Sequence, residues 1–90
     1  MRLYLTSRQN ERIKQAAKLR DRSGREESGR LLIEGYRETL RALDNGVKPF
    51  ELFYCPPLFQ GSNEPTLIER CAAQGADLLE CAESVFRKLS

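Results

Sequence analysis

The chain has 90 residues, which is enough for one small domain with one modest hydrophobic core. Hydrophobic residues make up 40% of it and charged residues 31%, a composition too apolar for a disordered chain. It contains neither a signal peptide pattern nor an apolar run near the roughly 20 residues that would span a bilayer, so we expect a cytoplasmic protein with no membrane partner.

Cysteine and histidine usage limits the chemistry that the chain can perform. Cys55, Cys71 and Cys81 show no CxxC spacing, which argues against a disulfide framework and against a zinc site. We therefore expect reduced, buried thiols that act as small hydrophobic groups. Histidine is absent, so the chain lacks the usual transition-metal ligand and the usual general base at neutral pH. We expect no metal site.

The net charge of +2 is distributed unevenly along the chain. Residues 1–41 contain eleven Lys and Arg against six Asp and Glu, whereas residues 42–90 contain four against seven. The first part is thus net +5 and the second net −3. A polyanionic partner is expected to meet the N-terminal part.

The first predicted element is an amphipathic helix over residues 8–22, for which Thr6 or Ser7 can supply the N-cap. Ile13 and Ala16 fall on its apolar face. The opposite face is cationic and carries Arg8, Arg12, Lys14, Lys18 and Arg22.

A loop, a strand and a second helix are predicted next. Residues 23–29 are polar and contain two glycines, which predicts a loop. The apolar run Leu31-Leu32-Ile33 predicts a buried strand, which Glu34-Gly35 ends. A helical pattern begins at Tyr36 and stops at Asn45-Gly46.

The second half of the chain continues to alternate strands and helices. Residues 50–55 are rich in aromatics and predict a strand closed by prolines, residues 63–75 predict a helix, and residues 76–81 predict a third strand. One or two helical turns follow to Leu89. This order implies an α/β domain, a three-layer α/β/α sandwich around a small, largely parallel sheet.

No motif of a catalytic centre occurs in the sequence. There is no GxSxG elbow, no phosphate-binding GxxxxGK[ST] loop and no GxGxxG, and the carboxylates are scattered. Glu34 is placed differently, because it lies at a strand-to-helix turn where α/β domains hold functional groups. Gly35 beside it permits a tight turn. A purely local role for Glu34, facing the amides that begin the next helix, is the alternative.

The cations predict a surface that binds RNA. Except for Arg22, which has Glu26 four residues away, those of the first helix are not balanced by acids at that spacing, and the cluster continues into the following glycine-containing loop. Arg37 follows at a helix start, where exposed amides also favour a phosphate. A solvated surface without a partner is the alternative. The predicted RNA-binding residues are Arg8, Arg12, Lys14, Lys18, Arg22, Arg25, Arg30, Glu34, Gly35 and Arg37.

Two sequence motifs resemble a known family. They are Ser7-x-x-Asn10-x-x-Ile13-Lys14 and Gly29-x-Leu31-Leu32-Ile33-Glu34-Gly35-x-Arg37. They are similar to the N-terminal substrate-binding domain of SpoU-type (SPOUT superfamily) RNA 2′-O-ribose methyltransferases. Ala42-Leu43-x-x-Gly46, Leu52-Phe53 and Val85-Phe86-x-Lys88-Leu89-Ser90 extend the resemblance over nearly the whole chain, while residues 56–75 add little to it.

The resemblance implies a fold similar to that of kink-turn-binding ribosomal proteins, which grip RNA at the turn corresponding to residues 34–37. It also implies that the domain holds ribosomal or transfer RNA for a knotted catalytic domain that uses S-adenosylmethionine. The family's catalytic and cofactor motifs do not occur in residues 1–90. We therefore expect residues 1–90 to form an RNA substrate-binding domain without cofactor or catalysis of its own. It would be monomeric, and the catalytic domain would follow residue 90 in a homodimeric parent enzyme.

Three other readings remain open at this point. The chain could be a free-standing RNA-binding protein of the kink-turn type, or a protein-interaction module that docks its basic helix on an acidic partner. A small enzyme is the least supported, because no nucleophile and base are paired in the sequence.

Overall fold

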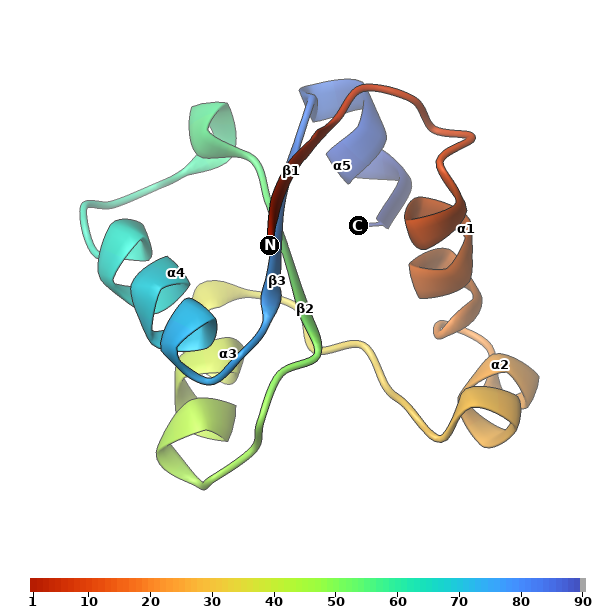
Figure 1. Cartoon of the computed structure of the whole chain (residues 1–90), viewed down its shortest axis with the longest axis horizontal. Helices are drawn as coiled ribbons and strands as arrows, with labels where there is room; N and C mark the ends of the chain where they lie inside the picture. Colours follow the sequence, from red (N-terminus) through yellow and green to blue (C-terminus); the bar gives the residue numbers. More distant parts are fainter. Residues whose placement is uncertain (90) are drawn as a thin grey trace.

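The computed structural model describes residues 1–89 and arranges them in three layers (Figure 1). The central layer is a parallel sheet of order β1-β3-β2, formed by β1 (Arg2–Leu5), β2 (Glu51–Tyr54) and β3 (Asp77–Cys81). Helices α1 (Glu11–Lys18) and α5 (Glu83–Leu89) cover one face, and α3 (Tyr36–Asp44) and α4 (Glu64–Ala73) cover the other. The predicted α/β class with a small parallel sheet is confirmed.

Two short elements lie outside this arrangement. Helix α2 (Arg22–Ser28) extends beyond the end of α1 and buries none of its residues, and a single 3₁₀ turn, η1 (Pro56–Leu58), follows β2. No helix within the described residues is long and apolar enough to cross a membrane.

The central strand β3 supplies the core of both faces. Leu78 and Leu79 are 1% and 0% exposed, and consecutive side chains of a strand point to opposite faces. Leu79 packs in the cluster under α1 and α5 with Ile13, whereas Leu78 packs in the cluster under α4 with Ile68. Adjacent residues of one strand therefore hold the two helical layers to the sheet.

The three cysteines are free and buried, as predicted. Burial raises the pKa of each thiol above its ordinary value, and it raises the pKa of Cys81 to about 11. All three therefore stay protonated near neutral pH and contribute to packing. Cys71 belongs to the core on the α4 side, and Cys81 belongs to the core on the α1 side.

The N-terminal region differs from the prediction. Residues 2–5 form the edge strand β1, which the sequence did not predict, because only Leu5 of this strand is buried. The helix predicted over residues 8–22 is shorter in the structure: it begins at Glu11 and ends at Lys18, and Arg22 is the first residue of α2. The N-cap of α1 is Asn10, whose Oδ1 accepts a hydrogen bond from the Arg12 amide at 2.9 Å.

The predicted loop over residues 23–29 is wrong, because most of it forms α2. Gly24 lies against the end of α1, and a Cβ built on it would be 2.1 Å from the carbonyl oxygen of Lys18. Gly29 ends α2 with a positive φ of 70°. Gly24 thus permits a close contact between two helices, and Gly29 ends a helix. A glycine-containing polar segment can serve these purposes or form a loop, and composition alone does not tell them apart.

The buried strand predicted over residues 31–33 is also wrong. The segment lies outside the sheet, and Leu31 and Ile33 are 64% and 38% exposed. The two positions beside the central strand β3 are occupied by β1 and β2, so the segment has no place next to it. An apolar run predicts burial without showing which strands compete for the same neighbour.

Two isoleucine substitutions test this assignment of the core. Ile13→Ala should lower the free energy of unfolding by about 2–5 kcal/mol, since Ile13 is fully buried and its loss leaves a cavity. Ile33→Ala removes the same atoms from an exposed site and should cost well under that amount. Urea unfolding of both variants measures the difference, and equal losses would contradict the assignment.

Candidate nucleic-acid interface

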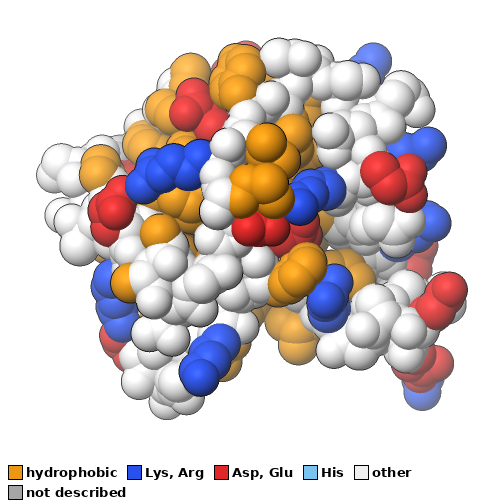
Figure 2. Space-filling view, viewed as in Figure 1, with side chains coloured by type: hydrophobic (Ala, Val, Ile, Leu, Met, Phe, Trp, Pro, Cys, Tyr) orange, Lys and Arg blue, Asp and Glu red, His pale blue; other side chains and the backbone are white. Residues whose placement is uncertain are grey.

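The predicted RNA-binding cations are not equivalent in the structure. On the side occupied by α1 and α2, Figure 2 shows Lys and Arg side chains interspersed with acidic ones. Some of the predicted cations are held by partners within the domain. Four of them are exposed and have side chains that make no hydrogen bond or ion pair within residues 1–89: Arg8, Lys14, Lys18 and Arg37.

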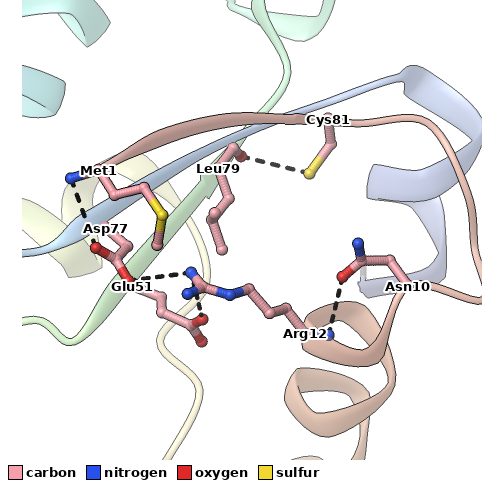
Figure 3. A network of polar contacts seen from close by, with 7 residues as sticks. All are labelled: Met1, Asn10, Arg12, Glu51, Asp77, Leu79 and Cys81. Carbon is pink, nitrogen blue, oxygen red and sulfur yellow. Dashed lines mark hydrogen bonds and ion pairs between the residues drawn. The ribbon is translucent and has the colours of Figure 1, made fainter.

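Arg12 points from α1 toward the sheet and joins two carboxylates (Figure 3). Its Nη1 lies 3.0 Å from Oδ2 of Asp77 and 3.4 Å from Oε2 of Glu51. The terminal amine of Met1 is 3.6 Å from Oδ1 of Asp77. Glu51 and Asp77 are the first residues of β2 and β3, so Arg12 fastens α1 to the amino end of the sheet. We leave Arg12 out of the interface because its charge is already neutralised.

Burial dominates the electrostatics of this network at Glu51. Desolvation raises the pKa of the Glu51 carboxyl, and the nearby positive charges of Arg12 and Arg30 offset only part of that rise. The negative charge of Asp77 acts in the same direction as burial. Arg12 therefore offsets part of the repulsion between these two neighbouring carboxylates.

Arg25 closes the junction between α1 and α2. Its Nη1 donates to the carbonyl oxygens of Leu19 and Arg20, at 3.1 and 2.8 Å. These carbonyls lie just beyond α1, where backbone acceptors have no partner within the helix. Together with the close approach of Gly24 to Lys18, this contact sets the direction of α2 relative to α1.

Two further predicted cations also have partners inside the domain. Arg22 pairs with Glu26 one turn along α2, at 2.8 Å. The guanidinium of Arg30 lies 3.7 Å from the centre of the Phe50 ring, a cation–π contact that connects the segment after α2 to the start of β2. Both side chains remain exposed, yet each already has an attractive contact within the domain.

The turn before α3 holds the remaining predicted residues. Gly35 has a φ of 94° and precedes α3, and no side chain caps the first amides of that helix. The carboxylate of Glu34 is 3.8 Å from the guanidinium of Arg20, which makes it part of the α1–α2 side. Arg37 instead lines an open pocket of about 330 Å³ on α3. The structure therefore places the predicted residues on two layers and does not gather them into one cluster.

Sequence reasoning missed a second group of cations. A pocket of about 440 Å³ lies between the turn before α1 and helix α5, and Arg87 and Lys88 line it beside Arg8. No local pattern in the sequence indicated this, because the two sides of the pocket are almost the whole chain apart. The pairing of β1 with β3 and the hydrogen bond from Lys88 to the carbonyl oxygen of Arg8 bring them together.

The two pockets differ in the charge of their lining. The pocket beside Arg8 carries three cations and no carboxylate, and its positive charge would oppose the positive sulfonium of S-adenosylmethionine, whereas the pocket on α3 carries Arg37, Arg41 and Asp44. Within residues 1–89, no three side chains of the kinds that bind metals are grouped around a common point.

A three-layer α/β domain whose α1 side presents Arg8, Lys14 and Lys18 without an ion pair among residues 1–89 is suited to bind a polyanion. The chain belongs to the family described as the MRM3-like substrate binding domain, which it matches over residues 10–90. The relationship predicted from its motifs, to the N-terminal substrate-binding domain of SpoU-type RNA 2′-O-ribose methyltransferases, is thereby confirmed. Ser90, the last residue of the closing motif, lies outside the described residues.

Two solved structures are similar to the chain. One is an rRNA methyltransferase from Sinorhizobium meliloti, with a TM-score of 0.81 and 26% identity. The match covers 98% of this chain and 31% of that protein. The other is an RNA 2′-O ribose methyltransferase, with a TM-score of 0.78 and 37% identity, covering 32% of that protein and 100% of this chain. The chain thus spans about a third of these proteins. Comparison with curated proteins gave no match.

Substitution of Arg12 tests its structural assignment. Arg12→Met removes the guanidinium, keeps much of the aliphatic length, and leaves Glu51 and Asp77 without their shared cation. The free energy of unfolding should fall by about 1–3 kcal/mol, because the pair is only partly buried. Lys14→Met, two residues along the same helix, is the control and should change stability by less than ~0.5 kcal/mol. Equal melting temperatures for the two variants would contradict the assignment of Arg12 as a residue that stabilises the fold.

Proposed function

We propose that this chain binds ribosomal or transfer RNA and positions it for 2′-O-ribose methylation. The methyl group would be transferred by an S-adenosylmethionine-dependent SPOUT domain that follows residue 90. Membership of a substrate-binding family supports the RNA partner. The observation that carries the proposal is the set of exposed cations on the α1 side, Arg8, Lys14 and Lys18, whose side chains make no hydrogen bond or ion pair within residues 1–89.

Helix α1 presents its cations where a nucleic-acid backbone can reach them. Lys14 and Lys18 are four residues apart and therefore lie on one side of the helix, opposite the buried Ile13 and Ala16. Each lysine that meets a phosphate releases condensed counterions, which gives affinity without sequence preference. The α1 surface therefore supplies attraction. At α3, Arg37 follows helix amides that no side chain caps, an arrangement that favours a phosphate.

The remaining parts of the proposal concern the parent protein. The domain works beside its own catalytic domain, which carries the cofactor and the contact of a homodimer, while residues 1–90 bind no cofactor and are monomeric alone. Three free, buried thiols are in keeping with the reducing conditions of the cytoplasm, where we place the protein.

Neutralising the α1 lysines tests the proposed RNA contact. Lys14→Gln with Lys18→Gln should weaken binding of a labelled RNA hairpin by roughly tenfold at low salt, because two charge-assisted contacts are lost. Fluorescence anisotropy gives the affinity, and thermal melting should be unchanged. The matched control, Arg2→Gln with Lys48→Gln, removes the same charge elsewhere and should bind normally. Equal weakening in both variants would indicate a response to net charge alone and would contradict a localised contact.

Salt dependence and the downstream reading frame separate the competing functions. RNA binding should weaken steeply with salt, with a log–log slope of about −0.7 per phosphate contacted on a single strand. If this chain does not bind RNA and binds an acidic protein, it is a protein-interaction module. A knotted methyltransferase domain should be encoded after residue 90. A stop codon there, with RNA binding retained, would favour the free-standing kink-turn type of protein.

A further inference from the structure

A second cationic site lies between the turn before α1 and helix α5. Its pocket of about 440 Å³ is open and is lined by Arg8, Gln9, Ser84, Arg87 and Lys88. The backbone joins the carboxyl ends of β1 and β3, because the Ala82 amide donates to the carbonyl oxygen of Leu5 at 2.9 Å. The two chain segments that leave β1 and β3 therefore start side by side and form opposite walls.

Lys88 holds the two walls together. Its Nζ donates to the backbone carbonyl oxygen of Arg8 at 2.9 Å, which fastens the turn before α1 to the last turn of α5. An ammonium has three donors, so this contact leaves two for a ligand. Lys88 is half-buried, and its charge is not matched by a carboxylate at ion-pair distance within residues 1–89. The pocket thus has a pre-positioned cation.

The pocket walls carry an excess of positive charge and of hydrogen-bond donors. The only ion pair formed by a lining residue, within the described part of the chain, joins Arg87 to Glu83 at 3.4 Å, and both side chains are mostly exposed. Arg8 makes no such pair. The hydroxyl of Ser84 and the amide of Gln9 add neutral donors. Three cations with neutral donors match the acceptor oxygens of a phosphate group.

The pocket follows the carboxyl ends of two paired strands. Arg8 and Ser84 each come three residues after the last residue of β1 and β3, and these two strands are hydrogen-bonded neighbours. Helix α1 leads from the turn that carries Arg8 toward α2 (Figure 1), and its Lys14 and Lys18 are exposed. The pocket therefore adds cations near the start of the helix that carries the exposed lysines.

We infer that this pocket is a phosphate-binding subsite, in which Arg8, Arg87 and Lys88 hold one backbone phosphate of the RNA while Ser84 and Gln9 donate to its remaining oxygens. The inference rests on the proposed function, since it takes RNA as the source of the phosphate. It adds α5 to the RNA-contacting surface and makes the turn before α1 a specific contact.

Two substitutions that leave Lys88 in place test the inference. Arg8→Gln with Arg87→Gln should weaken binding of the labelled RNA hairpin by roughly tenfold at low salt and reduce the magnitude of the log–log salt slope by about 0.7, the value for one phosphate. Arg2→Gln with Lys48→Gln removes equal charge from outside the pocket and should retain the affinity and slope of the unmodified chain. Thermal melts should be the same for both variants.

A second measurement uses inorganic phosphate alone as the probe. In two-dimensional NMR spectra, phosphate should shift the amide signals of Gln9 and Ser84 in the unmodified chain and leave them unmoved in the Arg8→Gln, Arg87→Gln variant. If the unmodified chain binds the hairpin and the pocket variant binds it equally well, with the same slope and no phosphate shifts, the subsite is refuted and the proposed function stands. If the unmodified chain fails to bind RNA at all, the proposed function itself is refuted.

Discussion

The whole domain depends on the burial of one strand from both sides. Leu78 and Leu79 of β3 face opposite helical layers, and both are almost completely inaccessible to water. Leu79 packs with Ile13 and Ala16 of α1 in one core cluster, which determines the side of α1 that faces the sheet. The side that faces water is thereby determined as well. The lysines face water because the isoleucine faces the sheet. The cationic surface is in this sense a product of hydrophobic packing in the central strand.

The same geometry gives the arginines different structural roles. Arg12 lies on the flank of α1 that meets the amino end of the sheet, where it neutralises Glu51 and Asp77. Arg25 serves backbone carbonyls at the end of α1, and Arg30 stacks on an aromatic ring. Guanidinium groups suit these tasks because they present several donors in one plane. The number of cations on a predicted helix face therefore overstates the positive charge that is available to RNA. The contacts that these cations make within the fold determine how many stay available.

Much of the fold was predictable, and the errors have physical reasons. The helices at residues 36–44 and 64–73 and the strands at 51–54 and 77–81 follow from local periodicity and from proline and glycine signals, and the prediction located each of them. Strand β1 and the exposure of Ile33 depend on which segment pairs with β3, a competition that local patterns do not reveal. At the site, the outward lysines followed from helix period, whereas the partners of Arg12 lie 39 and 65 residues away in sequence and only the folded sheet brings them near.

The reactivity of the buried thiols can report on local opening of the domain. Cys71 lies on the buried side of α4, and Cys81 lies in β3 beneath α1 and α5, so each helical layer encloses one of these sulfurs. A protonated, enclosed sulfur reacts with alkylating reagents only when its layer lifts away. The labelling rates of Cys71 and Cys81, resolved from that of the third buried thiol, Cys55, would therefore register the opening of each layer separately. A ligand that clamps one layer would slow one rate and leave the other unchanged.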